Sequence, residues 1–317
     1  MYGARVMLAV GLAGMGACAV CGCSGERGGI TVGFSQIGAE SAWRTAETQS
    51  IREEAKKRAV NLKFSDAQQK QENQIKAIRS FIVQGVDAII LAPVVETGWE
   101  PVLREAKRAR IPVVLVDRGV KVSDQSLYAT LIASDFVEEG RMAGRWLAKK
   151  MGGKAKIVQL EGTPGSDPAN DRKKGFEEVI AKYPEMQIIA SQTGDFRRSE
   201  GKRVMANIVN AKGKDIQAIY AHNDDMALGA IQAVDAEGMK PGTGVIVISI
   251  DAVHDAFQAM IDGKLNATVE CNPLLGPLAF DAVETILKGE KIAKRIVVRD
   301  RLFEQATAAE DIKTRKY

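Results

Sequence analysis

The chain has 317 residues, 45% of them hydrophobic, and its 44 Lys and Arg residues nearly balance 40 Asp and Glu residues, giving a formal net charge of +4. This length and apolar content suffice for the cores of two domains, which excludes intrinsic disorder. Basic and acidic residues are interleaved, as in SIREEAKKRA (50–59), which is typical of solvated helix faces and not of a basic stripe that binds nucleic acid.

The first 23 residues have the composition of an export signal. Arg5 precedes an apolar stretch over 6–20 that is too short and too rich in glycine for a transmembrane helix. The end of the segment resembles a bacterial lipoprotein signal, with Cys23 as the lipidated residue and 24–29 as a tether. Cys18 is the rival acceptor, and an ordinary cleaved signal is the alternative.

Cysteine and histidine usage predicts neither a disulfide nor a metal site. Cleavage before Cys23 would remove Cys18 and Cys21 and leave Cys271 as the only other cysteine. The spacing of Cys18 and Cys21 lacks a second ligand pair, and the two histidines of the chain are isolated from each other. We therefore expect no metal and no cofactor.

Short β-branched runs alternate with amphipathic stretches from residue 30 onward, which predicts an α/β fold with parallel sheets covered on both faces. The strands are predicted at 30–36, 60–65, 88–93, 112–117, 128–133, 155–161, 186–192, 218–223, 245–251, 265–271 and 295–300.

Amphipathic spacing predicts the helices between these strands. Over 70–84, Ile75, Ile78 and Phe81 fall on one side, and Gly85 is placed to end the helix. So many strands exceed one ordinary sheet, which indicates two doubly wound parallel-sheet lobes that divide near Ser134. No linker marks this boundary, and short crossovers are therefore expected to join the lobes.

Polar residues stand where three predicted strands end. Asp117 and Arg118 follow IPVVLV, Asn223 follows AIYAH, and Asp251 follows VIVISI. In open parallel sheets, ligands bind beyond the carboxyl ends of the strands. Two carboxylates, a guanidinium and an amide supply many directional donors and acceptors, which suits a sugar.

Two aromatic residues occur in polar surroundings and are candidates to stack on a sugar ring. These are Trp43 in AESAWRTAE and Phe196 in TGDFRRSE, in a chain with only 5% aromatic residues. Trp99 and Trp146 lie on amphipathic stretches and are assigned to packing.

Each polar candidate also has a purely structural interpretation. Asp117 could cap the next turn, and Arg118 could form a surface ion pair. Asp224 or Asp225 is expected to cap the helix that follows. The glycine-containing turn over 161–175 lacks the spacing of a Walker motif and is expected to line a ligand cleft.

Long runs of the chain resemble the periplasmic sugar-binding proteins of ABC importers from about residue 30 to 300. They include TVGFSQIGAESAWRTAET, QQKQENQIKAIRSFIVQGVDAI, APVVETGWEPVLREAK, DRKKGF and YAHNDDMALGAIQA, and they are most similar to galactofuranose-binding members. The resemblance implies the type I fold of periplasmic binding proteins, with two lobes joined by a three-crossover hinge. The N-lobe would hold 30–133 and 272–297, and the C-lobe 134–271 and 298–317.

The resemblance also implies a set of sugar-binding residues. In this sequence they are Trp43, Arg44, Asp117, Arg118, Arg172, Phe196, Asn223 and Asp251, with Ser35, Gln36, Glu40, Asn170 and Cys271 as lesser candidates.

The chain also departs from the ribose-binding members of the family. Trp43 and Arg44 stand where these have a pair of phenylalanines, Cys271 stands where they have a glutamine, and Asn170 stands where they have an arginine. The first of these differences argues against ribose.

We expect an exported binding protein that captures a monosaccharide, galactofuranose or a related sugar, and delivers it to an ABC permease with a separate ATPase subunit. The expected location is the periplasm or the outer face of the cytoplasmic membrane, with membrane contact only through an N-terminal lipid. The protein is expected to be a monomer and not an enzyme.

Three other functions are weighed against this expectation. A sugar-sensing subunit for a chemoreceptor or sensor kinase would have the same cleft. A glycosidase could use Asp117 and Asp251, but Arg118 and Asn223 nearby are expected to keep both ionised. A related repressor would carry a helix-turn-helix where this chain has an export signal.

Overall fold

The computed structural model describes residues 1, 2 and 29–317. The predicted export signal beyond its first two residues, the predicted tether up to residue 28, and the lipidation candidates Cys23 and Cys18 lie outside the described residues. Among the helices of the described part, none is both long enough and apolar enough to cross a bilayer.

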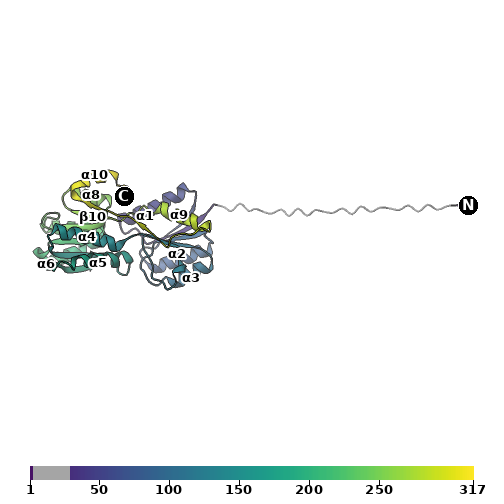
Figure 1. Cartoon of the computed structure of the whole chain (residues 1–317), viewed down its shortest axis with the longest axis horizontal. Helices are drawn as coiled ribbons and strands as arrows, with labels where there is room; N and C mark the ends of the chain where they lie inside the picture. The colour runs from purple at the N-terminus through teal and green to yellow at the C-terminus, as the bar shows by residue number, and fades with distance from the viewer. Residues whose placement is uncertain (3–28) are drawn as a thin grey trace.

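Two six-stranded sheets form the framework and appear as two bodies side by side in Figure 1. The first sheet has the order β11-β5-β4-β3-β1-β2 and the second the order β12-β10-β9-β8-β6-β7. The strands of the first sheet are β1 (Thr31–Gln36), β2 (Asn61–Asp66), β3 (Ala88–Leu91), β4 (Val113–Val116), β5 (Thr130–Ser134) and β11 (Arg295–Val298). Those of the second are β6 (Lys154–Glu161), β7 (Glu185–Thr193), β8 (Ala218–Ala221), β9 (Ile246–Asp251), β10 (Ala267–Glu270) and β12 (Leu302–Glu304).

The predicted fold class, two doubly wound parallel-sheet lobes, is confirmed. All neighbouring strands pair in parallel except β10 and β12. All eleven predicted strands are present, and β12 was missed because three residues at a sheet edge are too short to show a pattern. Within each sheet the order of the first five strands is the flavodoxin-like one, which places ligand sites beyond the carboxyl ends of the strands.

Helices cover both faces of each sheet, and Figure 1 places α1, α2, α3 and α9 around the first sheet and α4, α5, α6, α8 and α10 around the second. Their bounds are α1 (Ala42–Lys57), α2 (Gln71–Val83), α3 (Glu100–Arg108), α4 (Phe136–Lys150), α5 (Asp167–Ile180), α6 (Arg198–Lys212), α7 (Asp224–Ala236), α8 (His254–Ile261), α9 (Gly276–Leu287) and α10 (Ala308–Asp311).

The predicted end of the helix over 70–84 is confirmed by the backbone of α2. Gly85 has a φ of +64°, which glycine adopts without steric cost. Its N–H donates to the carbonyl of Ile82, and the N–H of Val86 donates to that of Phe81. These two bonds satisfy carbonyls that a helix end leaves open.

The chain passes between the two sheets after β5, after β10 and after β11. The lobes are therefore joined by short crossovers, as expected. Arg295 of β11 donates to the backbone carbonyl of Ser134 at the end of β5, with 3.1 Å between the nitrogen and the oxygen, which ties β11 to the start of the first crossover.

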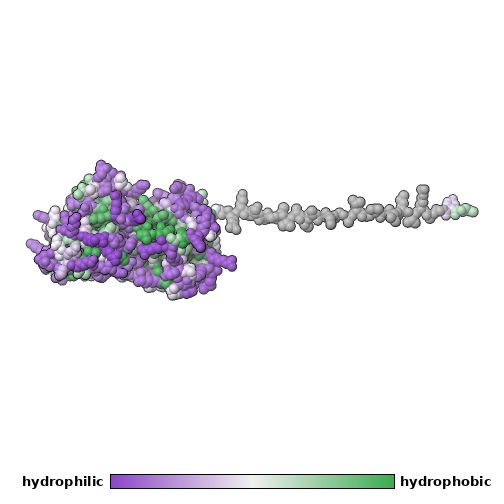
Figure 2. Space-filling view, in the orientation of Figure 1, coloured by the Kyte–Doolittle hydropathy of each residue, from purple (hydrophilic) through white to green (hydrophobic). Residues whose placement is uncertain are grey.

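Each sheet is packed by its own apolar core. In the first sheet, β3 and β4 are buried on both faces, as central parallel strands are. Trp99 packs in this lobe and Trp146 in the other, so both are core residues as predicted. The surface seen in Figure 2 is mainly hydrophilic, with an apolar area where α1 and α9 lie.

Two glycines let α4 and α5 approach closely in the second lobe. A Cβ added at Gly175 of α5 would lie 1.9 Å from the carbonyl oxygen of Val137, and one added at Gly140 of α4 would lie 2.3 Å from that of Arg172. Backbone-to-backbone contact therefore fixes the position of α5, the helix that carries Arg172.

Candidate functional site

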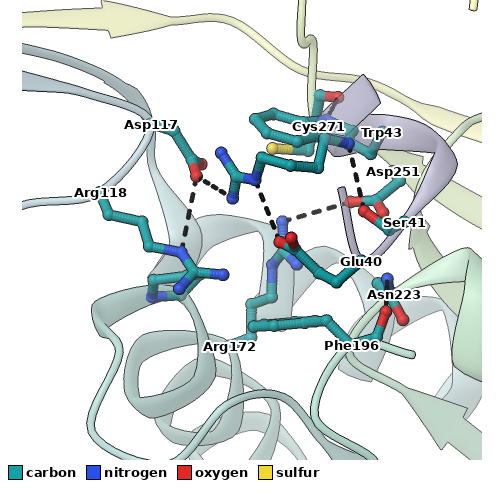
Figure 3. Close-up of a pocket in the computed structure, with 12 residues that line it drawn as sticks. Glu40, Ser41, Trp43, Asp117, Arg118, Arg172, Phe196, Asn223, Asp251 and Cys271 are labelled. Atoms are coloured by element: carbon teal, nitrogen blue, oxygen red, sulfur yellow. Dashed lines mark hydrogen bonds and ion pairs between the residues drawn. The ribbon is translucent and has the colours of Figure 1, made fainter. Parts of the chain in front are cut away.

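A cavity lies between the two lobes, beyond the carboxyl ends of strands from both sheets (Figure 3). All eight residues implied by the resemblance line it, together with the lesser candidates Glu40 and Cys271. The complete lining is Glu40, Ser41, Trp43, Arg44, Asp117, Arg118, Pro168, Arg172, Phe196, Asn223, Asp251 and Cys271.

Sequence reasoning did not name Ser41 or Pro168, although it expected the turn over 161–175, which contains Pro168, to line a cleft. Ser41 is the N-cap of α1, and its hydroxyl accepts the N–H of Arg44. Pro168 lies in the first turn of α5. Both are common at helix starts, so their residue types gave no sign of a ligand site.

A tight backbone turn places the charges that follow β4. The N–H of Asp117 donates to the carbonyl of Ile132 in β5, and the N–H of Arg118 donates back to the carbonyl of Val116, with 2.7 Å between nitrogen and oxygen. This bond closes a γ-turn with Asp117 at its centre, at a φ of +60°. A non-glycine residue held in this region of backbone space is strained, and such strain clusters at functional sites.

Arg44 of α1 is the centre of a buried ion network on the N-lobe side. Its guanidinium pairs with Asp117 Oδ2 at 2.6 Å, with Glu40 Oε1 at 3.1 Å and with Glu47. Burial alone would lower the pKa of Arg44, but the three carboxylates together raise it well above its usual value. Burial also raises the pKa of Glu47 to about 7. Arg44 therefore stays charged and holds Asp117 in place.

Arg118 is also buried, but it forms fewer ion pairs and hydrogen bonds than Arg44 to offset the cost of burial. One of its terminal nitrogens donates to the carbonyl of Val94 at 2.9 Å. Its buried Nε lies 3.6 Å from Asp117 Oδ2, too far for a hydrogen bond, and has no hydrogen-bond partner among the described residues. Burial, and then the charge of Arg44, lower its pKa. Its guanidinium lies 5.3 Å from the ring centre of Phe196 in the other lobe. A buried donor without a partner is costly, so this group is poised to bind a ligand oxygen.

A second arginine network lies on the C-lobe side. Arg172 of α5 donates from Nε to Glu139 at 2.7 Å and from a terminal nitrogen to the carbonyl of His222 at 2.6 Å. Its other terminal nitrogen lies 3.7 Å from Asp251. Burial raises the pKa of Asp251 well above its usual value, which contradicts the expectation that this carboxylate is simply kept ionised. Asp251 is thus a carboxyl group without a partner at hydrogen-bond distance in the part of the chain that the structure describes.

Asn223 is the N-cap of α7, so the expectation that Asp224 or Asp225 caps this helix was wrong. The side-chain oxygen of Asn223 accepts the N–H of Met226 at 3.0 Å, and its amide nitrogen donates to the carbonyl of Phe196 at 3.2 Å. Each end of the amide can form one more hydrogen bond. Asp224 is instead buried against Ser249, Thr268 and the N–H of Val253.

The two aromatic candidates lie on opposite sides of the cavity in Figure 3. The indole N–H of Trp43 donates to the carbonyl of Cys271 at 2.6 Å, which fixes its ring. Phe196 has a φ of +58°, and its ring fills the space where Gly162 has no side chain. These two faces suit the apolar C–H surfaces of a sugar ring.

The structure places three lesser candidates outside the lining of the cavity. Gln36 donates to Glu47 at 3.0 Å and to Thr48 at 2.9 Å. Ser35 is fully buried, and its hydroxyl has no hydrogen-bond partner within residues 29–317. Asn170 is exposed and donates to Glu96 at 2.8 Å. Gln36 therefore supports the network of Arg44 from behind.

The lining balances three guanidinium groups against three carboxyl groups, namely Arg44, Arg118, Arg172, Glu40, Asp117 and Asp251. Among the described residues, no group of three or more His, Cys, Asp or Glu side chains is arranged to hold a metal ion. Paired guanidinium and carboxyl groups, free hydrogen-bonding positions and two ring faces suit an uncharged polyhydroxyl molecule.

Comparisons with known proteins agree with this chemistry. The family model described as periplasmic binding protein domain matches residues 32–291. The galactofuranose-binding protein YtfQ of Escherichia coli (strain K12) is 52% identical over 291 residues, which cover 90% of this chain and 92% of that protein.

Two solved structures of high similarity carry furanose sugars. One is the periplasmic binding protein of the arabinose ABC transporter from Shewanella sp. ANA-3, bound to α- and β-L-arabinofuranose; it is 56% identical, has a TM-score of 0.88, and the match covers 90% of this chain and 95% of that one. The other is a protein from Mycobacterium smegmatis in complex with β-D-fucofuranose; it is 52% identical, also has a TM-score of 0.88, and the match covers 91% and 95%.

Proposed function

This chain belongs to the periplasmic binding protein family, and we propose that it captures one monosaccharide in furanose form, galactofuranose or a close relative, between its lobes. The observation that carries the proposal is the cavity, which both lobes line with paired charges and two ring faces. The furanose form comes from the two similar structures that hold furanoses.

The proposed contacts divide between the lobes. Asp117 and Arg118 would bind ring and anomeric oxygens from the N-lobe, while Arg172, Asn223 and Asp251 would bind hydroxyls from the C-lobe. Trp43 and Phe196 would stack on the two faces of the ring. Arg44 and Glu40 would complete the N-lobe side, and Cys271 would lie at the hinge.

Binding would be coupled to closure of the lobes, which we propose to be 30–133 with 272–297 and 134–271 with 298–317. Since the cavity is lined from both sides, only the closed state offers the full set of contacts. In that state the protein, as a monomer in the periplasm, would deliver the sugar to an ABC permease with a separate ATPase. A lipid on Cys23 would tether it to the membrane.

We propose that the chain does not act as an enzyme. The relatives reported above are binding proteins, and Asp117 is held in an ion pair with Arg44. The raised pKa of Asp251 would suit a proton donor, so the point needs a direct test. Nitrophenol released from a nitrophenyl galactofuranoside by wild-type protein, and not by Asp251→Asn, would contradict the proposal.

The binding proposal is tested with D-galactose, L-arabinose and D-ribose in a thermal-shift panel on the protein from Gly28 onward. A sugar at about 100 times its dissociation constant adds about 2.7 kcal/mol of stability, which gives a clear shift. We expect shifts with galactose or arabinose, and none with ribose. The ring form of bound galactose labelled with ¹³C at C1 is then read by NMR, and a bound pyranose or silence across the panel would overturn the furanose assignment.

A further inference from the structure

Two carboxylates of the C-lobe accept backbone N–H groups of the N-lobe, and neither carboxylate lines the cavity. Asp225 Oδ2 accepts the N–H of Ala42 with 2.8 Å between nitrogen and oxygen. Asp167 Oδ2 accepts the N–H of Gly119 at 2.7 Å. Figure 3 shows Arg118, the neighbour of Gly119, on one side of the cavity, and Ser41 and Asn223, which are near Ala42 and Asp225 in sequence, on the other.

Asp225 is placed to bond the N-lobe when the two lobes are closed on each other. Ala42 is the first residue of α1, and its N–H has no acceptor within that helix, so a carboxylate there also interacts favourably with the helix dipole. The other oxygen of Asp225 accepts from Arg198 Nε at 2.8 Å, and Arg198 also binds Asp255 of its own lobe at 2.9 Å. Arg198 thus holds the Asp225 carboxylate in position, and Asp255 shares that arginine without a bond to the N-lobe in this structure.

Asp167 makes the corresponding contact beyond Arg118. It is the first residue of α5, and its second oxygen, Oδ1, is shielded from solvent without a partner in the described part of the chain. Next to it, the N–H of Glu96 in the N-lobe donates to the carbonyl of Gly165 at 2.9 Å, and the Glu96 carboxylate accepts from Asn170. The cross-lobe bonds therefore occur at two separate places around the cavity.

We propose that Asp225 and Asp167 are positioning residues that hold the lobes closed and so set how long the sugar stays bound, without touching it. Their bonds join residues of different lobes, so they exist only in the closed state, whereas the sugar contacts of one lobe form first. The apparent affinity for a ligand that needs the closed state follows the closing equilibrium. This inference rests on the proposed function.

The test compares Asp225→Ala and Asp167→Ala with the matched control Asp255→Ala, using stopped-flow fluorescence with D-galactose and L-arabinose. A hydrogen bond to a charged group corresponds to about a tenfold change in an equilibrium constant, or more. We expect the sugar to dissociate about tenfold faster from each of the two variants, with association within twofold of wild type. Asp255→Ala should match wild type in both rates.

The conservative variant Asp225→Asn distinguishes a role of Asp225 in holding the lobes together from a general loss of structure. Asp225→Asn keeps an acceptor oxygen for the N–H of Ala42 and should recover part of the residence time, although it loses the charge that Arg198 holds. Urea unfolding without sugar establishes that the variants are folded. Dissociation rates equal to wild type, or an association rate reduced by the same factor as the affinity, would overturn the proposal.

Amide hydrogen exchange gives a readout that does not depend on the sugar assignment. The N–H groups of Ala42 and Gly119 should exchange faster in Asp225→Ala and Asp167→Ala respectively, but not in Asp255→Ala. If wild type responds to neither sugar, the proposed function fails and this exchange pattern still tests the closure residues. Unprotected Ala42 and Gly119 amides in wild type, with and without sugar, would overturn the closure proposal itself.

Discussion

Arg44 Nη2 on α1 lies 2.6 Å from Oδ2 of Asp117, the residue at the centre of the strained turn after β4. The same guanidinium also binds Glu40 and Glu47. A helix at the start of the lobe thereby holds a side chain that the fourth strand presents, and the geometry of the N-lobe half of the cavity depends on one buried charge.

Replacing Arg44 with an uncharged residue should destabilise the protein and disrupt the N-lobe half of the site. In Arg44→Met, three carboxyl groups lose their shared partner in a buried place, and removal of one member of a buried ion pair costs about 3–5 kcal/mol. We expect a loss of this size in the free energy of unfolding, measured by urea titration without sugar, and no sugar binding. A variant as stable as wild type would contradict the role of Arg44.

The same substitution at Arg118 should weaken sugar binding strongly while changing the free energy of unfolding little. Its pKa is lowered by burial and by Arg44, and its Nε lies 3.6 Å from Asp117 Oδ2, beyond hydrogen-bond distance, so its charge contributes little to the stability of the sugar-free protein. Arg118→Met should change the free energy of unfolding by no more than about 1 kcal/mol, while raising the dissociation constant for the sugar at least about a hundredfold. Calorimetric titration measures the dissociation constant, and urea unfolding measures the stability. An unchanged sugar affinity would show that Arg118 is not a sugar-binding residue.

Gly162→Ala should weaken sugar binding by displacing an aromatic ring. The added Cβ would lie 1.9 Å from the Phe196 ring, so the ring must move. We expect a lower affinity and a modest loss of stability, about 1–3 kcal/mol, as for other overpacked sites. Gly29→Ala is the control, since its Cβ would meet only the carbonyl oxygen of Ala59, at 3.5 Å. Unchanged affinity in Gly162→Ala would argue against a stacking role for Phe196.

Gly175→Ala should separate α4 from α5 and thereby shift Arg172. The new Cβ would lie 1.9 Å from a backbone oxygen of α4, which cannot turn aside as a side chain can. The melting temperature and the sugar affinity should both fall. Gly144→Ala in α4 is the graded control, because its Cβ would overlap less, lying 2.9 Å from the Cβ of Val179 and 3.2 Å from the carbonyl oxygen of Phe176. Equal losses in the two variants would contradict the backbone-contact explanation.

Asp224 should make the stability of the protein depend on pH. Burial raises its pKa to about 7, partly offset by the hydrogen bonds from Ser249, Val253 and Thr268. The unfolded chain releases this proton near pH 4, so folding takes up a proton between about pH 4 and 7, and stability falls as pH rises through that window.

The variant Asp224→Asn isolates this effect, because its amide can serve the N–H of Val253 with its oxygen and donate to the hydroxyls of Ser249 and Thr268. Relative to this variant, wild type should lose up to about 1.4 kcal/mol of unfolding free energy per pH unit between pH 4 and 7. Urea titrations across that range measure the difference, and parallel curves would contradict it.

The sequence predicted much of the cavity because parallel strands end at a shared edge. Asp117, Arg118, Asn223 and Asp251 follow strands directly, so strand prediction alone brought them together. Resemblance to a family added Arg172, which sits within a helix where no strand end marks it. Neither source foresaw that Asn170 turns away to Glu96, because that contact depends on how the two lobes meet.

The counter-charges behind the cavity were also beyond sequence reasoning. In the sequence, Glu47 and Glu139 have the pattern of ordinary exposed polar residues of a helix. In the structure both are buried beside arginines. Asn223 and Asp224 are adjacent and similar in size, and either could cap a helix. Burial of Asp224 against Ser249 and Thr268 decides the outcome, and only the assembled second sheet brings those hydroxyls to it.

The pairing of β11 with β5 has a consequence for the order in which the chain can fold. Leu131 of β5 pairs with Arg295, which is synthesised only after the whole second sheet except β12. Until then β5 is an open edge, and strands that wait for distant partners fold slowly and are prone to aggregate. The first sheet therefore cannot be completed on a growing chain until β11 has been synthesised, however early its other five strands pair.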